Sequence, residues 1–178
     1  MEILIDSAVE LRELCESDAL DIFNTINSQR EYLGEWLPFV EFTREIKFTQ
    51  DFVDAALLSM HETSDFLFTI RCDDNFAGII GFKGTDIQNK RTEIGYWLSY
   101  DYQGKGIITK AVNKLTEFAF EVLNMNRVQI KVAVNNHKSK NIPERLGFKL
   151  EGVERDGELL SGGVFTDLFV YSKLKSDG

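Results

Sequence analysis

Two glycines separated by one residue stand where a predicted strand gives way to a long predicted helix. Gly104 and Gly106 follow a segment of alternating side chains, 92–99, and open a stretch, 104–123, whose apolar residues keep helical spacing. The free N–H groups at a helix start attract a phosphate, and glycine lacks the Cβ atom that would block close approach of the backbone. The sequence therefore predicts a pyrophosphate-binding turn. It comprises Gln103, Gly104, Lys105, Gly106, Ile107, Ile108 and Thr109.

The spacing of this turn disfavours two common nucleotide-binding motifs. It does not read GxxxxGK followed by Ser or Thr, and it does not stand in the strand–GxGxxG–helix unit of a parallel dinucleotide fold. Neither ATP nor NAD is therefore the expected ligand. A GxG pair alone is a weak signal, and a helix start with flexible glycines is its alternative interpretation.

The segments before and after the turn predict one mixed sheet. Alternation over 66–72, a turn at 73–75 and an apolar run over 77–82 indicate a hairpin, and 92–99 adds a third sequential strand. A helix then separates this antiparallel meander from a further strand at 128–134, which implies one parallel pair at the crossover. A parallel pair can part there and admit a ligand.

The remaining segments complete an α/β domain that we expect to span residues 1–178. No repeat or linker interrupts the chain. We expect a mixed, mostly antiparallel sheet of six or seven strands flanked by helices. Further strands are expected at 9–14, 149–153 and 164–174, and further helices at 18–27, 30–36, 50–61 and 144–146.

Two helix starts carry recognisable capping signals. Ser17 is the expected N-cap of the helix over 18–27, and Thr49 that of the helix over 50–61. Phe48 and Val53 would then form a hydrophobic staple around Thr49.

Composition narrows the classes of protein. The chain has no basic, apolar leader and no run of about 18 apolar residues, so we expect a cytoplasmic protein that is neither secreted nor membrane-spanning. Its net charge of −9 disfavours nucleic acid as a partner and suits a cationic substrate. Cys15 and Cys72 have no CxxC spacing and no activating partner, so neither a metal site nor a covalent enzyme intermediate is expected.

Four segments, in this order and spacing, resemble the GNAT acetyltransferase superfamily, and within it the branch of bacterial ribosomal-protein (serine/alanine) N-terminal acetyltransferases. The glycine turn matches the family pattern Q/R-x-x-G-x-G/A at both glycines, although Asp101 replaces Gln or Arg at its first position. The segments are Val9-Glu10-Leu11-Arg12, residues 32–38 (YLGEWLP), residues 93–98 (EIGYWL) leading into the turn, and Asn136-His137-Lys138-Ser139 followed by Arg145-Leu146-Gly147-Phe148.

The resemblance implies an acyl-CoA N-acyltransferase fold whose sheet is split by acetyl-CoA at the parallel pair. It implies transfer of the acetyl group to a primary amine in a ternary complex, with no metal. A backbone N–H of Trp97 or Leu98 would stabilise the oxyanion, and Asn136 would meet the pantetheine arm.

The same resemblance assigns acid and base roles. Ser139 would protonate the departing thiolate, and Glu158, on the loop before the last strand, would be the general base, with Glu93 acting through water as the alternative. Structural roles compete with each assignment. Asn136 and Ser139 would only cap the helix leading into Pro143, Glu158 would be solvated, and Glu93 would pair with Lys90 or Arg91.

The acceptor stays open at this stage. The branch points to the α-amino group of a protein, and a polyamine, an aminoglycoside or another small amine is the alternative. A non-catalytic acyl-CoA-binding module is the rival from another class, since Asp101 departs from the family pattern. A homodimer through the C-terminal strands is a family-level expectation.

Overall fold

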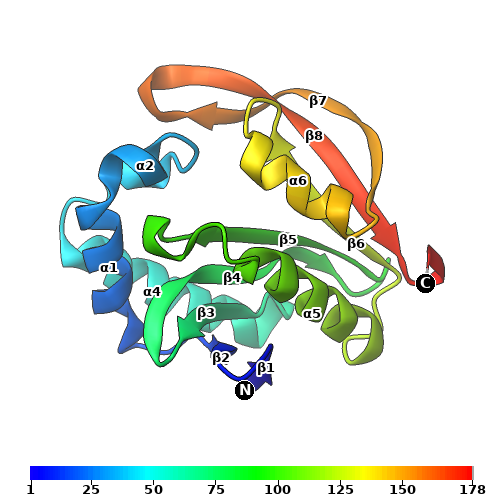
Figure 1. The fold of residues 1–178 in the computed structure, drawn as a ribbon, viewed down its shortest axis with the longest axis horizontal. Helices are drawn as coiled ribbons and strands as arrows, with labels where there is room; N and C mark the ends of the chain where they lie inside the picture. Colours follow the sequence, from blue (N-terminus) through cyan, green and yellow to red (C-terminus); the bar gives the residue numbers. More distant parts are fainter. Residues whose placement is uncertain (178) are drawn as a thin grey trace.

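The computed structural model describes residues 1–177 and, of His61, only the backbone. The expected domain range extends to Gly178, which lies outside the described residues. An eight-stranded sheet, in the order β1-β2-β3-β4-β5-β6-β8-β7, forms the centre of the fold (Figure 1). The strands are β1 (Glu2–Leu4), β2 (Val9–Glu13), β3 (Leu67–Cys72), β4 (Asn75–Asp86), β5 (Arg91–Leu98), β6 (Arg127–Ala133), β7 (Lys149–Leu160) and β8 (Val164–Leu174).

Helices cover both faces of the sheet. Figure 1 shows α5 and α6 in front of the strands and α4 behind them. Side chains of α5 share one buried cluster with the strands, whereas α1, α2 and α4 enclose a second cluster on the other face. The helices are α1 (Asp18–Ser28), α2 (Arg30–Gly34), α3 (Phe39–Phe42), α4 (Ile46–Thr63), α5 (Ile107–Glu121) and α6 (His137–Arg145).

The parallel pair that the sequence predicts lies between β5 and β6. Only Arg91, Thr92 and Glu93 of β5 pair with β6, opposite residues 127–129. Beyond Glu93 the two strands part, and β6 pairs with β8 on its other side. Residues 94–98 of β5 therefore pair with β4 on one side and face a gap on the side of β6.

The sheet has more strands than the six or seven expected. The additional edge strand is β1, whose three residues pair with residues 10–12 of β2. Three residues are too few to show an alternation in the sequence. The strand β7 also runs to Leu160 instead of Val153, so Glu158 lies within a strand opposite Thr166 and not on a loop.

Of the two expected N-caps, Ser17 does stand at the N-cap position of α1 but forms no capping bond, and Thr49 is wrong. The Ser17 side chain makes no capping hydrogen bond, and it is the Asp18 carboxylate that accepts the Cys15 N–H at 2.9 Å. Helix α4 begins at Ile46, so Thr49 lies inside the first turn and its hydroxyl donates to the Ile46 carbonyl at 2.8 Å. Phe48, which is 50% exposed, lies inside α4 and not before its N-cap, so it does not have the position that a staple with Val53 requires.

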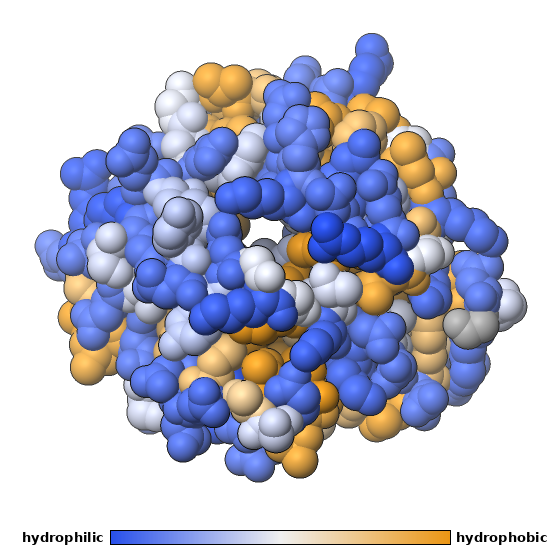
Figure 2. All heavy atoms as spheres, in the orientation of Figure 1, coloured by the Kyte–Doolittle hydropathy of each residue, from blue (hydrophilic) through white to orange (hydrophobic). Residues whose placement is uncertain are grey.

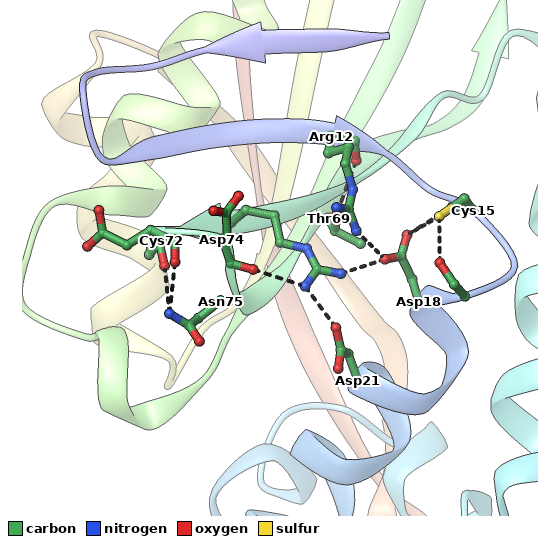
Figure 3. A network of polar contacts seen from close by, with 11 residues as sticks. Arg12, Cys15, Asp18, Asp21, Thr69, Cys72, Asp74 and Asn75 are labelled. Atoms are coloured by element: carbon green, nitrogen blue, oxygen red, sulfur yellow. Dashed lines mark hydrogen bonds and ion pairs between the residues drawn. The ribbon is translucent and has the colours of Figure 1, made fainter.

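Buried charge joins α1 to the sheet. Asp18 is 1% exposed and accepts from Arg12 at 2.8 Å and from Arg71 at 2.5 Å. Arg71 also pairs with Asp21 at 2.8 Å. In Figure 3, Arg12 and Asp18 point toward each other from β2 and α1. This network holds α1 in place beside β2 and β3.

Within residues 1–177, no helix is both long enough and apolar enough to cross a membrane.

Candidate functional site

A cleft of about 960 Å³ opens where β5 and β6 part. Figure 2 shows a hollow near the middle of this face, rimmed mainly by hydrophilic residues. Residues from α2, β5, the glycine turn and α6 line the cleft. Among them are the sequence-predicted residues Trp97, Leu98, Gln103, Gly104, Gly106, Ile107, Ile108, Thr109, Asn136 and Ser139.

The backbone of the glycine turn leaves open space beside the start of α5. Gly104 and Gly106 have φ angles of 73° and 71°, which favour glycine, and a Cβ at either would point into open space. The first helical bond runs from the Lys110 N–H to the Gly106 carbonyl. The N–H groups of residues 107–109 therefore precede the helical ladder and are available to an anion.

Lys105 takes a different position from its neighbours in the turn. Its ammonium lies 5.1 Å from the centre of the Tyr102 ring, and it is not among the described residues that line the cleft. The structure thus gives Lys105 a contact with an aromatic ring at the edge of the site.

Gln103 connects three elements around the cleft. Its side-chain amide donates to the Tyr32 hydroxyl, and its amide oxygen accepts from the Lys138 ammonium at 3.0 Å. The Tyr32 hydroxyl in turn donates to the Leu98 carbonyl at 3.2 Å. Gln103 therefore ties α2 and α6 to the glycine turn.

The backbone N–H groups of Trp97 and Leu98 point to opposite sides of β5. The Ser99 N–H donates to Ala77 of β4 at 2.7 Å. Because peptide groups alternate in direction along a strand, the N–H of Leu98 faces the gap toward β6. Of the two candidate oxyanion donors, Leu98 has the favourable orientation.

Helix α6 begins seven residues earlier than expected, at His137, and it carries Ser139 on its first turn. The Asn136 side chain caps it by accepting the Ser139 N–H at 3.1 Å. The Ser139 hydroxyl does not cap the helix and lies 3.1 Å from the Tyr96 hydroxyl. Of the two residues expected to cap this helix, only Asn136 does so. The Ser139 hydroxyl contacts Tyr96 and is not engaged in capping.

Pro143 explains why Tyr96 also contacts the Ser139 backbone. Pro143 has no N–H to donate to the carbonyl four residues before it, which belongs to Ser139. That carbonyl accepts from the Tyr96 hydroxyl at 3.4 Å instead. Burial raises the pKa of Tyr96 to about 12, so this hydroxyl keeps its proton at neutral pH.

Glu93 lies on the opposite face of β5 from Tyr96. Its carboxylate pairs with Lys83 at 2.8 Å and accepts from the Gln129 amide at 3.0 Å. The expected pairing with Lys90 or Arg91 is therefore wrong, because Lys83 of the adjacent strand β4 stands directly opposite Glu93.

Glu158 shares this second face. Aligned residues of paired strands point to the same side of a sheet, and the register places Glu93 with Gln129, Gln129 with Ser172, and Glu158 with Thr166 on that side. Burial raises the pKa of Glu158, and the charge of Glu93 raises it further while Lys83 lowers it. The carboxyl is half-buried, so it is not simply a solvated surface group.

The gap between β5 and β6 therefore separates two sets of groups. The Ser139 and Tyr96 hydroxyls and the glycine turn lie on the face covered by α5 and α6, and the two glutamates lie on the other. A donor can approach the gap from one side and an acceptor from the other. This arrangement suits direct transfer of a group through the sheet.

Sequence reasoning missed Tyr32, Tyr96, Lys138 and Arg145, all of which line the cleft. Alternation along 92–99 already separates Tyr96 from Glu93, and could have directed attention to its hydroxyl. Lys138 and Arg145 share a helix face only once α6 is known to begin at His137.

Comparison with known proteins agrees with this geometry. The acetyltransferase (GNAT) domain family matches residues 8–149. The putative ribosomal N-acetyltransferase YdaF of Bacillus subtilis is 35% identical over 97% of this chain and 94% of its own. The spermidine N(1)-acetyltransferase of Escherichia coli is 28% identical over 82% of this chain and 75% of its own.

Two solved structures extend the comparison to three dimensions. The microcin C7 self-immunity acetyltransferase MccE, in complex with acetyl-CoA and AMP, is 30% identical with a TM-score of 0.90, over 96% of this chain and 94% of its own. The ribosomal L7/L12 α-N-protein acetyltransferase RimL, in complex with coenzyme A, is 26% identical with a TM-score of 0.91, over 98% of both chains. With a family match over most of its length and a relative above 30% identity, this chain belongs to the GNAT family of acetyltransferases.

Proposed function

We propose that this enzyme transfers the acetyl group of acetyl-CoA to the N-terminal α-amino group of a ribosomal protein, by direct attack in a ternary complex. The observation that carries the proposal is the gap between β5 and β6, which has hydroxyl groups and a phosphate-type turn on one face and two glutamates on the other. The similarity to YdaF and RimL supports a ribosomal acceptor.

The cleft fits coenzyme A. The free N–H groups of Ile107, Ile108 and Thr109 and the open space at both glycines would receive the pyrophosphate. Asn136, which lines the same cleft, would meet the pantetheine arm. When bound, acetyl-CoA supplies a thioester whose carbonyl carbon accepts an amine.

The acceptor must lose a proton before it attacks. An α-ammonium has a pKa of about 7.7 to 8.0, so a nearby carboxylate can take that proton at neutral pH. Glu158 lies on the acceptor face, and its raised pKa brings it closer to that range. Glu93 is held by Lys83 and Gln129, which favours a role in orienting water or acceptor over that of the base.

On the face of the sheet that α5 and α6 cover, backbone and side-chain groups would stabilise the negative charge that develops on the thioester oxygen and on the departing sulfur. The Leu98 N–H faces the gap and would stabilise the oxyanion. Ser139 would give its hydroxyl proton to the departing thiolate. Tyr96, whose hydroxyl lies 3.1 Å away, would pass its own proton to Ser139 and regain one from solvent in the cleft before the next turnover.

The proposal is tested by offering the enzyme acetyl-CoA with peptides that copy the N-termini of ribosomal proteins. Thiol release would measure turnover, and mass spectrometry of the product would locate the acetyl group. The control peptide has the same sequence with a blocked N-terminus. Acetylation of the free α-amino group alone supports the proposal, and acetylation of lysine side chains or of no peptide contradicts it.

Spermidine is the second candidate acceptor. The relative that acts on spermidine covers four-fifths of this chain, and the net charge of −9 suits a polycation. Turnover of spermidine without turnover of any peptide would select this alternative. Either acceptor, like acetyl-CoA, would place the reaction in the cytoplasm.

A further inference from the structure

Two cations stand along the cleft side of α6. Lys138 and Arg145 both line the cleft and are seven residues apart, which is two helical turns or about 10 Å along the axis. Among the described residues that line the cleft, Glu35 is the only carboxylate. In a chain whose net charge is −9, this helix face concentrates positive charge beside the cleft.

Lys138 lies at the glycine turn. Its ammonium donates to the Gln103 side chain at 3.0 Å, and Gln103 directly precedes Gly104. A phosphate at the free N–H groups of the turn would therefore lie close to Lys138. The ammonium can exchange a neutral amide oxygen for a charged phosphate oxygen, which is the stronger acceptor.

Arg145 has no charged partner in the part of the chain that the structure describes. The adjacent carboxylate of Glu144 is held by Lys140 at 3.6 Å and by the Tyr171 hydroxyl at 3.0 Å. Two turns of helix separate Arg145 from Lys138, and the Lys138 ammonium is held by Gln103 beside the glycine turn, so the two cations stand at different places along the cleft. Their spacing calls for a ligand with phosphates at two places.

We propose that Arg145 binds the 3′-phosphate of coenzyme A while Lys138 binds its pyrophosphate, so that Arg145 selects coenzyme A over 3′-dephospho-coenzyme A. The inference rests on the proposed donor. A guanidinium and a phosphate form paired hydrogen bonds of fixed geometry, so Arg145 suits the smaller, terminal group.

Calorimetric titration with coenzyme A and with 3′-dephospho-coenzyme A tests the assignment without an acceptor. The native protein should bind coenzyme A about tenfold more tightly than the dephospho form, the size of effect that one charge-assisted contact produces. Arg145→Gln should weaken binding of coenzyme A by about the same factor and leave the dephospho form unchanged. Lys138→Gln should weaken both equally.

Lys140→Gln is the matched control, because Lys140 lies on the same helix but contacts the Phe169 ring and Glu144 instead of the cleft. It should change neither affinity. Arg145→Lys keeps the charge and should retain part of the preference. Thermal unfolding of each variant verifies its fold.

The results distinguish the role of Arg145 from the identity of the acetyl donor. Equal affinities of the native protein for the two ligands, or an equal loss of both in Arg145→Gln, would overturn the role of Arg145 and leave the donor intact. Failure of the native protein to bind either ligand would reject the donor itself, and this inference with it.

Discussion

The hydroxyl oxygens of Tyr96 and Ser139 lie 3.1 Å apart and join the middle of β5 to the first turn of α6. This contact crosses the cleft at the level where the two parallel strands have already parted. It places a proton donor next to a second hydroxyl that burial keeps protonated, since the pKa of Tyr96 is about 12. Asn136 supplies the cap of α6, and the proposed function of the Tyr96–Ser139 pair is that of a proton relay.

Ser139→Ala should lower kcat by about a hundredfold, the usual contribution of general acid catalysis. The KM for acetyl-CoA should stay the same. The stability should fall by only about 1 kcal/mol, the loss of the Tyr96 hydrogen bond, because Asn136 and not Ser139 supplies the cap of α6. Steady-state kinetics and thermal unfolding measure these quantities. An unchanged kcat would mean that the thiolate takes its proton from elsewhere, and Tyr96→Phe would show whether Tyr96 is the source.

Glu158→Gln should abolish the acid limb of the pH profile of kcat/KM. A base acts when deprotonated, and because the pKa of Glu158 is raised, activity should fall at a pH above the ordinary 4.5 of glutamate. Rates of the native enzyme and the variant from pH 4.5 to 9 provide the measurement. A limb that persists in the variant would assign the base to another group.

Glu158→Gln should lower activity without lowering the stability of the folded protein. A raised pKa in the folded state means that folding favours the protonated carboxyl, so this contribution is present below the unfolded pKa and is lost as the pH rises through the folded one. At pH 8 Glu158→Gln should therefore be at least as stable as the native protein. A clear loss of stability at pH 8 would show that the glutamate is structural.

Asn136→Ala should destabilise the protein by about 1 kcal/mol, because it removes the side chain that caps α6. Asn136→Ser restores a capping oxygen and should recover most of that stability. Affinity for coenzyme A should stay low in both variants if the amide also meets the pantetheine arm. Chemical denaturation and calorimetry separate the two roles. Recovery of the affinity by serine would restrict Asn136 to capping.

Asp18→Asn should destabilise the protein by about 3 kcal/mol, since it removes the buried carboxylate that faces Arg12 and the buried Arg71 and leaves Arg71 with Asp21 alone. The control is Asp51→Asn, which breaks the exposed pair with Lys47 and should cause no measurable change. Denaturant titration of both variants compares the two. Equal effects would mean that burial of the Asp18 network adds nothing.

The strongly periodic segments of the chain could be predicted from the sequence. Alternation identified the strands around the glycine turn, and helical spacing identified α5. The parallel pair followed from their order alone. Elements governed by tertiary contacts were harder: α6 has few apolar residues and contains Pro143, which in the sequence looks like a helix terminator.

In the candidate site, too, residues set by local backbone chemistry could be predicted, whereas residues set by tertiary contacts could not. The turn could be located because backbone chemistry needs glycine at fixed positions, and both glycines do have positive φ angles. The partners of Gln103 and Ser139 come from α2, α6 and β5, which are 35 to 71 residues away in sequence. No local pattern encodes such contacts, so the partners of Tyr32, Tyr96 and Lys138 emerged only from the fold, although alternation already separates Tyr96 from Glu93.

The short pairing between β5 and β6 has a mechanical consequence. Three residue pairs join the two strands, whereas β6 and β8 share seven. The sheet thus consists of two parts, β1 to β5 and β6 to β8, which are joined only where residues 91–93 pair with residues 127–129. A donor wedged between the two parts would occupy the place of the missing ladder and brace them against each other. Each turnover would then stiffen the molecule when the donor arrives and loosen it again when the free thiol departs.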